Sequence, residues 1–276
     1  MRIFDYCIFL AGLILSVLPG RARGADITHS VSEIVLSSGE VECIVEDGMG
    51  MMWFGTTTGL VRFDGYQCKT YYTDLHGNPL FSSNHIQAMA CDHRGNLWIA
   101  TSKSLSVFDP QTLSVECVID DIPSQLGILK SILVTRAGRL LLGATTGLYR
   151  YDEAQGRFLL VKAGYVMTLF EDSSSRIWVG TWGSGFYAYD AELTRPVQFG
   201  EFDSLNLQVT GFEEDRNHRI WVCTWDNYVL LRLDNPDMAG SGKLSYKAYP
   251  ISSNKGNLTS SVMFGITYDE ENDALY

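Results

Sequence analysis

The sequence predicts an all-β protein, a β-propeller of four-stranded antiparallel blades, of which about five and a half are present as a truncated ring. A turn-and-tryptophan pattern recurs five times at intervals of 37 to 45 residues. Short β-prone runs surround every copy, and several are apolar throughout, as in sheets covered on both faces. Two unrelated β-sandwiches would not explain a turn and a Trp that repeat together.

The pattern reads Asp-x-x-Gly-x-h-Trp-h-Gly-Thr, where h is apolar, and Asp92 to Thr101 is a well-preserved copy. Asp at the first turn position can bond its own backbone, and Gly at the fourth accepts a positive φ. The Trp is expected to be the large residue packed between blades. The third copy has neither the Asp nor the Trp, although it keeps the Gly. The predicted structural residues are Asp47, Trp53, Asp92, Trp98, Asp172, Trp178, Asp215 and Trp221, with Thr135 and Leu141 in the third copy.

Each turn is flanked by a first strand and a Trp-bearing second strand, and two further strands follow. First strands are expected at 41–45, 86–90, 128–134, 166–170 and 209–212. Third strands are expected at 60–64, 105–109, 148–152, 186–190 and 229–234, after small turns that contain Gly59, Gly147 and Gly185. Fourth strands are expected at 66–71, 114–119, 157–161, 197–202 and 244–249. The blade repeats therefore span 41–71, 85–119, 128–161, 165–202 and 209–249.

An incomplete sixth copy occupies residues 258–276. Its first strand is expected at Val262–Tyr268, its turn at Asp269–Asp273, and its second strand from Leu275. An open ring would leave an apolar blade face and a sheet edge in water. We therefore expect an N-terminal fragment of a longer protein; the alternative is a partner chain that completes the ring.

Residues 1–24 are typical of a secretory signal peptide, which leaves 25–276 as the partial propeller. Arg2 precedes an uncharged run of 11 residues, Ile8 to Leu18, which is too short to span a bilayer comfortably. The alternative is an uncleaved anchor. Export implies an oxidising compartment, but the five remaining cysteines are odd in number and widely spaced. Cys43 and Cys223 are expected to be small core residues.

Composition limits the classes of partner. Hydrophobic residues make up 46% of the chain, enough for a sizeable core, and the net charge is −11. Long-range repulsion then disfavours nucleic acid and anionic membranes as direct partners.

The motif copies, and above all Trp53 to Gly65, resemble the two-component regulator propeller repeats. The resemblance covers residues 27–276 and suggests the N-terminal periplasmic sensor part of a Bacteroides-type hybrid histidine kinase. It implies an oligosaccharide ligand, control of polysaccharide-utilisation genes, further propeller and sensor domains, a dimer at full length, and membrane attachment only through the parent protein. The third copy and Ser104, which replaces Gly before Leu105, depart from the pattern.

By the same resemblance, Ile27–Leu36 would supply the outer strand of the last blade of the ring. None of the family's kinase, receiver or DNA-binding residues can be placed on this chain, so an enzyme is not expected.

No catalytic motif is found in the sequence: H-E-x-x-H, G-x-S-x-G and the P-loop are all absent. The five histidines are scattered, so no metal and no cofactor are expected. The repeated Asp resembles the sialidase Asp-box, with a turn one residue longer. A carboxylate repeated in nearly every blade is typical of a turn former and not of one member of a catalytic pair.

Trp182 and Trp225 each lie four positions after a repeat Trp, in the turn before a third strand. Aromatic faces there can stack on sugar rings while nearby polar groups bond hydroxyls. The candidate ligand-binding residues are Trp182, Ser184, Trp225, Asp226 and Asn227. Alternatively, the two Trp side chains pack against an adjacent loop. A glycan sensor is the favoured function; an exported propeller glycosidase or lyase, or a protein-interaction propeller, remain alternatives.

Overall fold

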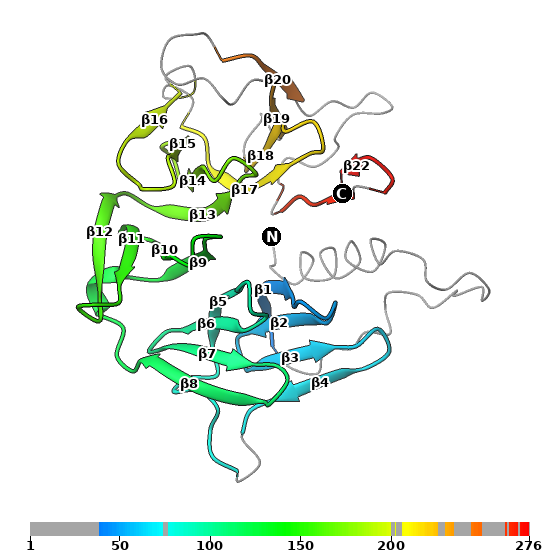
Figure 1. Ribbon diagram of the computed structural model, residues 1–276, viewed down its shortest axis with the longest axis vertical. Coiled ribbons are helices and arrows are strands. Elements are labelled where there is room, and N and C mark those ends of the chain that lie inside the picture. Colours follow the sequence, from blue (N-terminus) through cyan, green and yellow to red (C-terminus); the bar gives the residue numbers. More distant parts are fainter. Residues whose placement is uncertain are drawn as a thin grey trace, which may run out of the picture. The chain divides into compact units, whose positions relative to one another are not determined.

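Antiparallel sheets make up the chain, as the computed structural model shows (Figure 1). The structure describes residues 39–73, 77–199, 202, 206–225, 230–234, 244–249, 263, 265–269 and 271–275. These residues form five four-stranded sheets and one two-stranded sheet. In each four-stranded sheet the strands lie side by side in chain order, as in a propeller blade. The predicted all-β propeller class is confirmed.

The predictions for residues 1–24 and for Ile27–Leu36 concern segments outside the described residues. Within the described chain, no helix has both the length and the apolar character needed to span a bilayer. One 3₁₀ helix is present among these residues, at Ser124–Leu126.

The chain divides into two compact units at Ile122 and Pro123. The first unit contains two blades, whose strand ends lie within two residues of the expected positions. The first blade consists of β1 (Val41–Glu46), β2 (Met52–Thr56), β3 (Leu60–Phe63) and β4 (Cys68–Tyr71). The second blade consists of β5 (Ile86–Cys91), β6 (Leu97–Thr101), β7 (Leu105–Asp109) and β8 (Ser114–Ile119).

Trp53 joins the two blades of the first unit. Its side chain is fully buried, and its ring centroid lies 5.3 Å from that of Phe108 in the second blade. Gly55, two residues later on β2, lets the blades approach closely: a Cβ placed there would lie 2.6 Å from Cγ2 of Ile86. The Trp and the Gly of the repeat therefore act together at the junction between blades.

The second unit contains three blades and a short hairpin. The third blade consists of β9 (Leu129–Val134), β10 (Leu140–Ala144), β11 (Gly147–Asp152) and β12 (Arg157–Ala163). The fourth consists of β13 (Val166–Glu171), β14 (Ile177–Thr181), β15 (Phe186–Tyr189) and β16 (Pro196–Gln198). The fifth consists of β17 (Val209–Glu214), β18 (Ile220–Thr224), β19 (Leu230–Leu233) and β20 (Tyr246–Tyr249). The hairpin consists of β21 (Tyr268–Asp269) and β22 (Ala274–Leu275).

Two predicted strands differ most from the expected bounds. The fourth strand of the fourth blade ends at Gln198 instead of residue 202. Phe199 and Phe202 are buried, and a turn hydrogen bond joins their backbones, so this apolar run fills the core after the ladder has ended. In the sixth copy, Met263 and Ile266 pack against Trp221 and lie outside β21. Val262 and Tyr276 lie outside the described residues.

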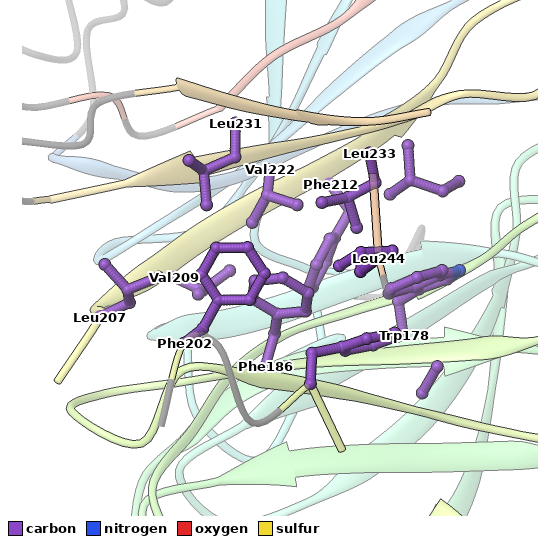
Figure 2. Packing of buried hydrophobic residues seen from close by; sticks show 13 residues of the cluster. Trp178, Phe186, Phe202, Leu207, Val209, Phe212, Val222, Leu231, Leu233 and Leu244 are labelled. Carbon is purple, nitrogen blue, oxygen red and sulfur yellow. The ribbon is translucent and has the colours of Figure 1, made fainter. Parts of the chain in front are cut away.

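The core between the fourth and fifth blades is built around Trp178. Its ring stacks on Phe199 at 5.6 Å and lies 6.0 Å from Phe212 of the fifth blade. Figure 2 shows Trp178 and Phe186 among the aliphatic side chains that the fifth blade contributes, including Val222 and Leu231. Trp178 thus occupies the same kind of junction as Trp53.

The other two Trp slots differ in their surroundings. Trp221 is buried and lies among Tyr249 and residues of the sixth copy, whereas Trp98 is only half-buried. Cys223, two residues after Trp221, is fully buried. Burial raises the pKa of the Cys43 thiol to about 12 and also raises that of Cys223. Both thiols are therefore uncharged; Cys223 is a buried core residue, whereas Cys43 is half-buried and packs against the core of the first unit.

Candidate ligand-binding site

Each repeat Asp binds its own turn and its own Trp. In the fourth blade, Oδ1 of Asp172 accepts the backbone N–H groups of Ser174 and Arg176 at 3.0 Å. Oδ2 accepts the indole Nε1–H of Trp178 and the Nε–H of Arg176, both at 2.7 Å. Both oxygens of this buried carboxylate are thus used by the fold.

The same indole-to-carboxylate bond is present in the three other intact copies. Its length is 2.7 Å for Trp53 and Asp47, 3.2 Å for Trp98 and Asp92, and 2.8 Å for Trp221 and Asp215. Sequence reasoning treated the Asp and the Trp as separate features. Their fixed spacing of six residues was the signal that could have linked them.

The Gly-Thr pair at the end of the second strand shapes the turn at the opposite end of the blade. Thr181 Oγ1 donates to the carbonyl of Gly185 at 2.7 Å and accepts the N–H of Ser184 at 3.1 Å. Gly183 and Gly185 adopt positive φ values of 89° and 66°, which suit glycine. The conformation of the turn that holds the candidate residues Trp182 and Ser184 is therefore set by the hydrogen bonds of Thr181 and by the two glycines.

Trp182 and Trp225 come together at this end of the fourth and fifth blades. Their ring centroids lie 5.7 Å apart at an interplanar angle of 62°. Tyr165, which directly precedes β13, lies 6.2 Å from Trp182 with its ring tilted by 32°. Tyr165 and Trp182 are each 37% exposed, and Trp225 is half-buried. We call Tyr165, Trp182 and Trp225 the aromatic cluster.

The other candidate residues are placed only in part. Ser184 is exposed in the turn that follows Trp182. Asp226 and Asn227 lie outside the described residues. Tyr165 was missed by sequence reasoning, since nothing in the chain between Tyr165 and Trp182 marks them as neighbours. Their proximity follows from the pairing of β13 with β14, because the N–H of Trp182 donates to the carbonyl of Tyr165 at 2.9 Å.

Comparison of the copies shows that the backbone hydrogen bond at this position does not depend on an aromatic side chain. The N–H of Trp225 donates to the carbonyl of Gln208, and in the third blade the N–H of Thr145 donates to the carbonyl of Ile128. In the first blade Thr57 donates to Glu40 in the same way. In each case the residue at this position forms the same backbone hydrogen bond, and Thr forms it as well as Trp. This backbone bond therefore does not account for the aromatic side chains of the cluster.

A second group of polar side chains gathers at the Asp-containing turns of the fourth and fifth blades. Ser173 Oγ donates to Oε1 of Glu214 at 2.5 Å. Nδ1 of His218 lies 2.9 Å from the same Oε1 and 3.0 Å from Ser173 Oγ. Both contacts of His218 use one ring nitrogen, whereas a hydrolytic relay uses Nδ1 for the acid and Nε2 for the nucleophile. In the described part of the chain, no three His, Cys, Asp or Glu residues are grouped as metal ligands would be.

Two segments, 80–103 and 161–183, match the model of the two-component regulator propeller family. They cover the second and fourth copies of the repeat, and the second segment includes Tyr165 and Trp182. No curated protein matches the chain.

Several solved structures share the fold. One is the extracellular domain of a hybrid two-component system from B. thetaiotaomicron, with 17% identity and a TM-score of 0.58 over 87% of this chain and 37% of that one. PorZ, a surface component of the type-IX secretion system of Porphyromonas gingivalis, has 16% identity and a TM-score of 0.63 over 86% and 37%. Virginiamycin B lyase from Staphylococcus aureus has 12% identity and a TM-score of 0.63 over 84% and 75%.

The chain thus spans 37% of the length of the two-component relative, and proteins with different activities share its architecture. At these identities the likeness shows the fold alone. The repeat motif, the family match and the blades agree with one another. Two segments of the chain match the two-component regulator propeller repeat, and the chain has a β-propeller fold.

Proposed function

We propose that this chain is a ligand-sensing propeller in the exported, periplasmic part of a hybrid two-component signalling protein. Its ligand is an oligosaccharide, and occupancy of the propeller controls polysaccharide-utilisation genes through domains outside this chain. The chain acts by binding and not by catalysis. The likeness to extracellular domains of Bacteroides two-component systems supports this proposal.

The observation that carries the proposal is the aromatic cluster. Tyr165 and Trp182 expose ring surface at positions where the first three blades carry Glu, His or Ile and Thr or Ser. The C–H groups of a pyranose ring pack on such a surface, and hydroxyls at the sugar's edge can bond neighbouring polar groups. Because the backbone bond at this position forms equally well with Thr, binding is the simplest reason for these exposed rings.

The position of the cluster also suggests how binding would be transmitted. Trp182 follows β14 of the fourth blade, and Trp225 follows β18 of the fifth blade. A sugar that contacts both rings would bind the native blade pair and not the unfolded chain, and would therefore stabilise it. A sensor can use such stabilisation as its signal.

The test is calorimetric titration of the complete exported part of the protein with neutral and acidic oligosaccharides. Trp182→Ala and Trp225→Ala should each weaken binding about tenfold, the effect of losing one stacking contact. Tyr66→Ala is the matched control, because Tyr66 is 97% exposed on the β3–β4 turn, at the other end of its blade. It should leave affinity unchanged, and all three variants should melt like the wild type.

Unchanged affinity in both Trp variants would refute the assignment of the site. Breakdown of the sugar during titration would instead support the glycosidase or lyase alternative, and an absence of any sugar binding would favour the protein-interaction alternative.

A further inference from the structure

We infer that the first blade presents a receiving face for another blade of the same repeat, and that Glu46 accepts a backbone N–H group from the Asp-containing turn of that blade. The receiving face is formed by Met52, Phe54, Val61 and Phe63. The incoming blade belongs to the same polypeptide, in the complete exported part of the protein. This inference concerns assembly and does not depend on the ligand of the aromatic cluster.

The receiving face is an apolar cluster whose described members all come from β1 to β4 of the first blade. Its four side chains are at most 9% exposed. Successive side chains of a strand point to opposite faces, so Met52 and Phe54 lie on the face of β2 away from Trp53. Trp53 contacts the second blade. The receiving face therefore belongs to the other side of the first blade.

The three junctions within the two units show what such a face receives. At each of them, the two residues that flank the repeat Trp in one blade pack with the residue at the Trp position of the preceding blade. These groups are Leu97 and Ile99 with Trp53, Ile177 and Val179 with Leu141, and Ile220 and Val222 with Trp178. Met52 and Phe54 flank Trp53 in the same way. Their expected partner is thus a large apolar residue at the Trp position of another blade.

The repeat Gly fits the same scheme, because it abuts the first residue of the next blade's first strand. A Cβ added at this Gly would lie 2.6 to 2.7 Å from that residue at each of the three junctions, which are Gly55 with Ile86, Gly143 with Val166 and Gly180 with Val209. Val41 holds the equivalent place in the first blade, since it pairs with Thr56 as Val209 pairs with Thr224. A β-branched residue thus stands where the Gly of an incoming blade would approach.

A second set of contacts repeats at the Asp-containing turns. The residue after the first turn position of one blade donates its backbone N–H to the residue that directly precedes the repeat Asp of the next blade. Arg136 donates to Oε2 of Glu171 at 2.7 Å, and Ser173 donates to Oε2 of Glu214 at 2.5 Å. The same two positions are hydrogen-bonded between the first and second blades and between the fifth blade and the sixth copy, through Gly48 with Cys91 and Arg216 with Tyr268.

Glu46 occupies this acceptor position in the first blade. It directly precedes Asp47 and pairs with Met52 across β1 and β2, as Glu171 pairs with Ile177. Its side chain is exposed, and a carboxylate is a strong acceptor for a backbone N–H. The first blade therefore carries the acceptor and the receiving face together, the combination that meets a preceding blade at the junctions described above.

The incoming blade is specified by the same contacts. It carries a large apolar residue at the Trp position, a Gly two residues later, and a residue other than Pro after the first turn position, because Pro has no N–H to donate. The junctions described above join blades of one polypeptide, and this chain spans 37% of the length of the two-component relative. The incoming blade is accordingly assigned to the same polypeptide.

The experiment is site-specific photo-crosslinking in the complete exported part of the protein. Glu46 is replaced by p-benzoylphenylalanine, and the crosslinked peptides are mapped by mass spectrometry after irradiation. The expected product joins position 46, within one polypeptide, to an Asp-containing repeat turn of a further blade. Glu171→p-benzoylphenylalanine is the positive control, which should crosslink to the turn of Arg136. The same replacement at Glu116, exposed on the outer strand β8, should reach no such turn.

Three results would overturn the inference while the Glu171 control succeeds. They are a crosslink from position 46 to residues 1–38, a crosslink to a second polypeptide, and no crosslink at all. The hydrogen bond itself is tested by melting: Glu46→Ala and Glu171→Ala should each lower the melting temperature by about 3 °C, and Glu116→Ala should not. A Glu46→Ala variant that melts like the wild type would refute the role of Glu46 as an acceptor.

Discussion

Asp172 and Trp178 are joined by a 2.7 Å hydrogen bond from the indole Nε1–H to the carboxylate Oδ2. This bond ties the turn at one end of the fourth blade to the ring that packs against the fifth blade. It also explains why the degenerate third copy has lost both residues together. Without the indole, a buried carboxylate would lose one of its hydrogen-bond donors. Thr135 instead accepts one backbone N–H, from Arg139 at 3.0 Å, and Leu141 fills the slot.

Asp172→Ala should therefore destabilise the protein strongly. The change leaves the indole N–H, the Arg176 guanidinium and two backbone N–H groups without their acceptor, in a site where Asp172 itself is fully buried. Removing one partner of a buried, charged network costs about 3 kcal/mol of unfolding free energy. Urea unfolding followed by Trp fluorescence measures it.

Asp152→Ala is the control for the loss of a turn carboxylate. Asp152 accepts only the N–H groups of Ala154 and Gln155, in an exposed turn. Its loss should cost less than about 1 kcal/mol, as for a solvated capping bond. Equal losses of unfolding free energy in Asp172→Ala and Asp152→Ala would show that the buried bond to the indole contributes no more than an exposed turn bond.

Gly180→Ala should destabilise by a different route, namely overpacking. A Cβ at this position would lie 2.6 Å from Cγ1 of Val209 in the next blade and 2.6 Å from Cγ2 of Thr168. Side chains or blades must shift to admit it, which typically costs about 2 kcal/mol. Gly48→Ala is the control, since its Cβ would meet nothing closer than 3.9 Å. A loss of stability in Gly48→Ala as large as that in Gly180→Ala would contradict the argument.

The features that could be predicted are those that repeat along the chain. The turns and most strand ends follow from local chemistry, because Asp, Gly and short β-branched runs act within a few residues. The position of Tyr165 beside Trp182 could not be predicted this way, since it depends on strand pairing. The early end of β16 was missed for a related reason. Phe202 is apolar because it fills the core, and sequence alone does not distinguish a buried apolar residue in a loop from one in a strand.

Glu213 and Glu214 are neighbours on β17 whose carboxyl groups have opposite environments. Burial, the largest influence, raises the pKa of Glu213 to about 7, although backbone hydrogen bonds from Glu214 and Tyr268 oppose it. The negative charge of Glu214 nearby also raises the pKa of Glu213. For Glu214 burial also raises the pKa, but hydrogen bonds from Ser173 and His218 outweigh it and hold the pKa below its usual range. Strand alternation places the two groups on opposite faces.

Stability should consequently fall as the pH rises through about 7. A carboxyl whose pKa is higher in the folded than in the unfolded state stabilises the fold fully below the ordinary pKa of 4.5 and loses that contribution through the folded pKa. Glu213→Gln cannot ionise, so it should flatten the stability profile between about pH 5 and 7, the window between the ordinary and the folded pKa. Thermal unfolding across this range measures the slope. A profile as steep as that of the wild type would show that Glu213 does not control it.

Glu214→Gln serves as the neighbouring control for this profile. Its lowered pKa places its own titration in more acidic solution, so the slope between about pH 5 and 7 should persist in this variant. A flattened slope in this variant would show that Glu214, and not Glu213, causes the fall in stability with rising pH.

Ser173 should not react with a fluorophosphonate probe, despite its contacts with His218 and Glu214. Activation of a serine requires a base nitrogen that accepts its proton while the acid binds the other ring nitrogen. Here Nδ1 of His218 faces both Ser173 Oγ and the Glu214 carboxylate, and one nitrogen cannot accept from the serine while it donates to the carboxylate. Ser173 instead donates directly to Glu214 at 2.5 Å, which fixes the turn of the fourth blade to the fifth.

The intact mass of the protein after incubation with the probe decides this question, with trypsin as the positive control for labelling. An unlabelled protein is the expected result, and Ser173→Ala should then change only the contact between the two turns. A single adduct that disappears in both Ser173→Ala and His218→Ala would show that the His218 ring turns to present Nε2 to the serine. The three residues would then be hydrolytic, and the exported-enzyme alternative would gain the acid–base machinery that its sequence does not reveal.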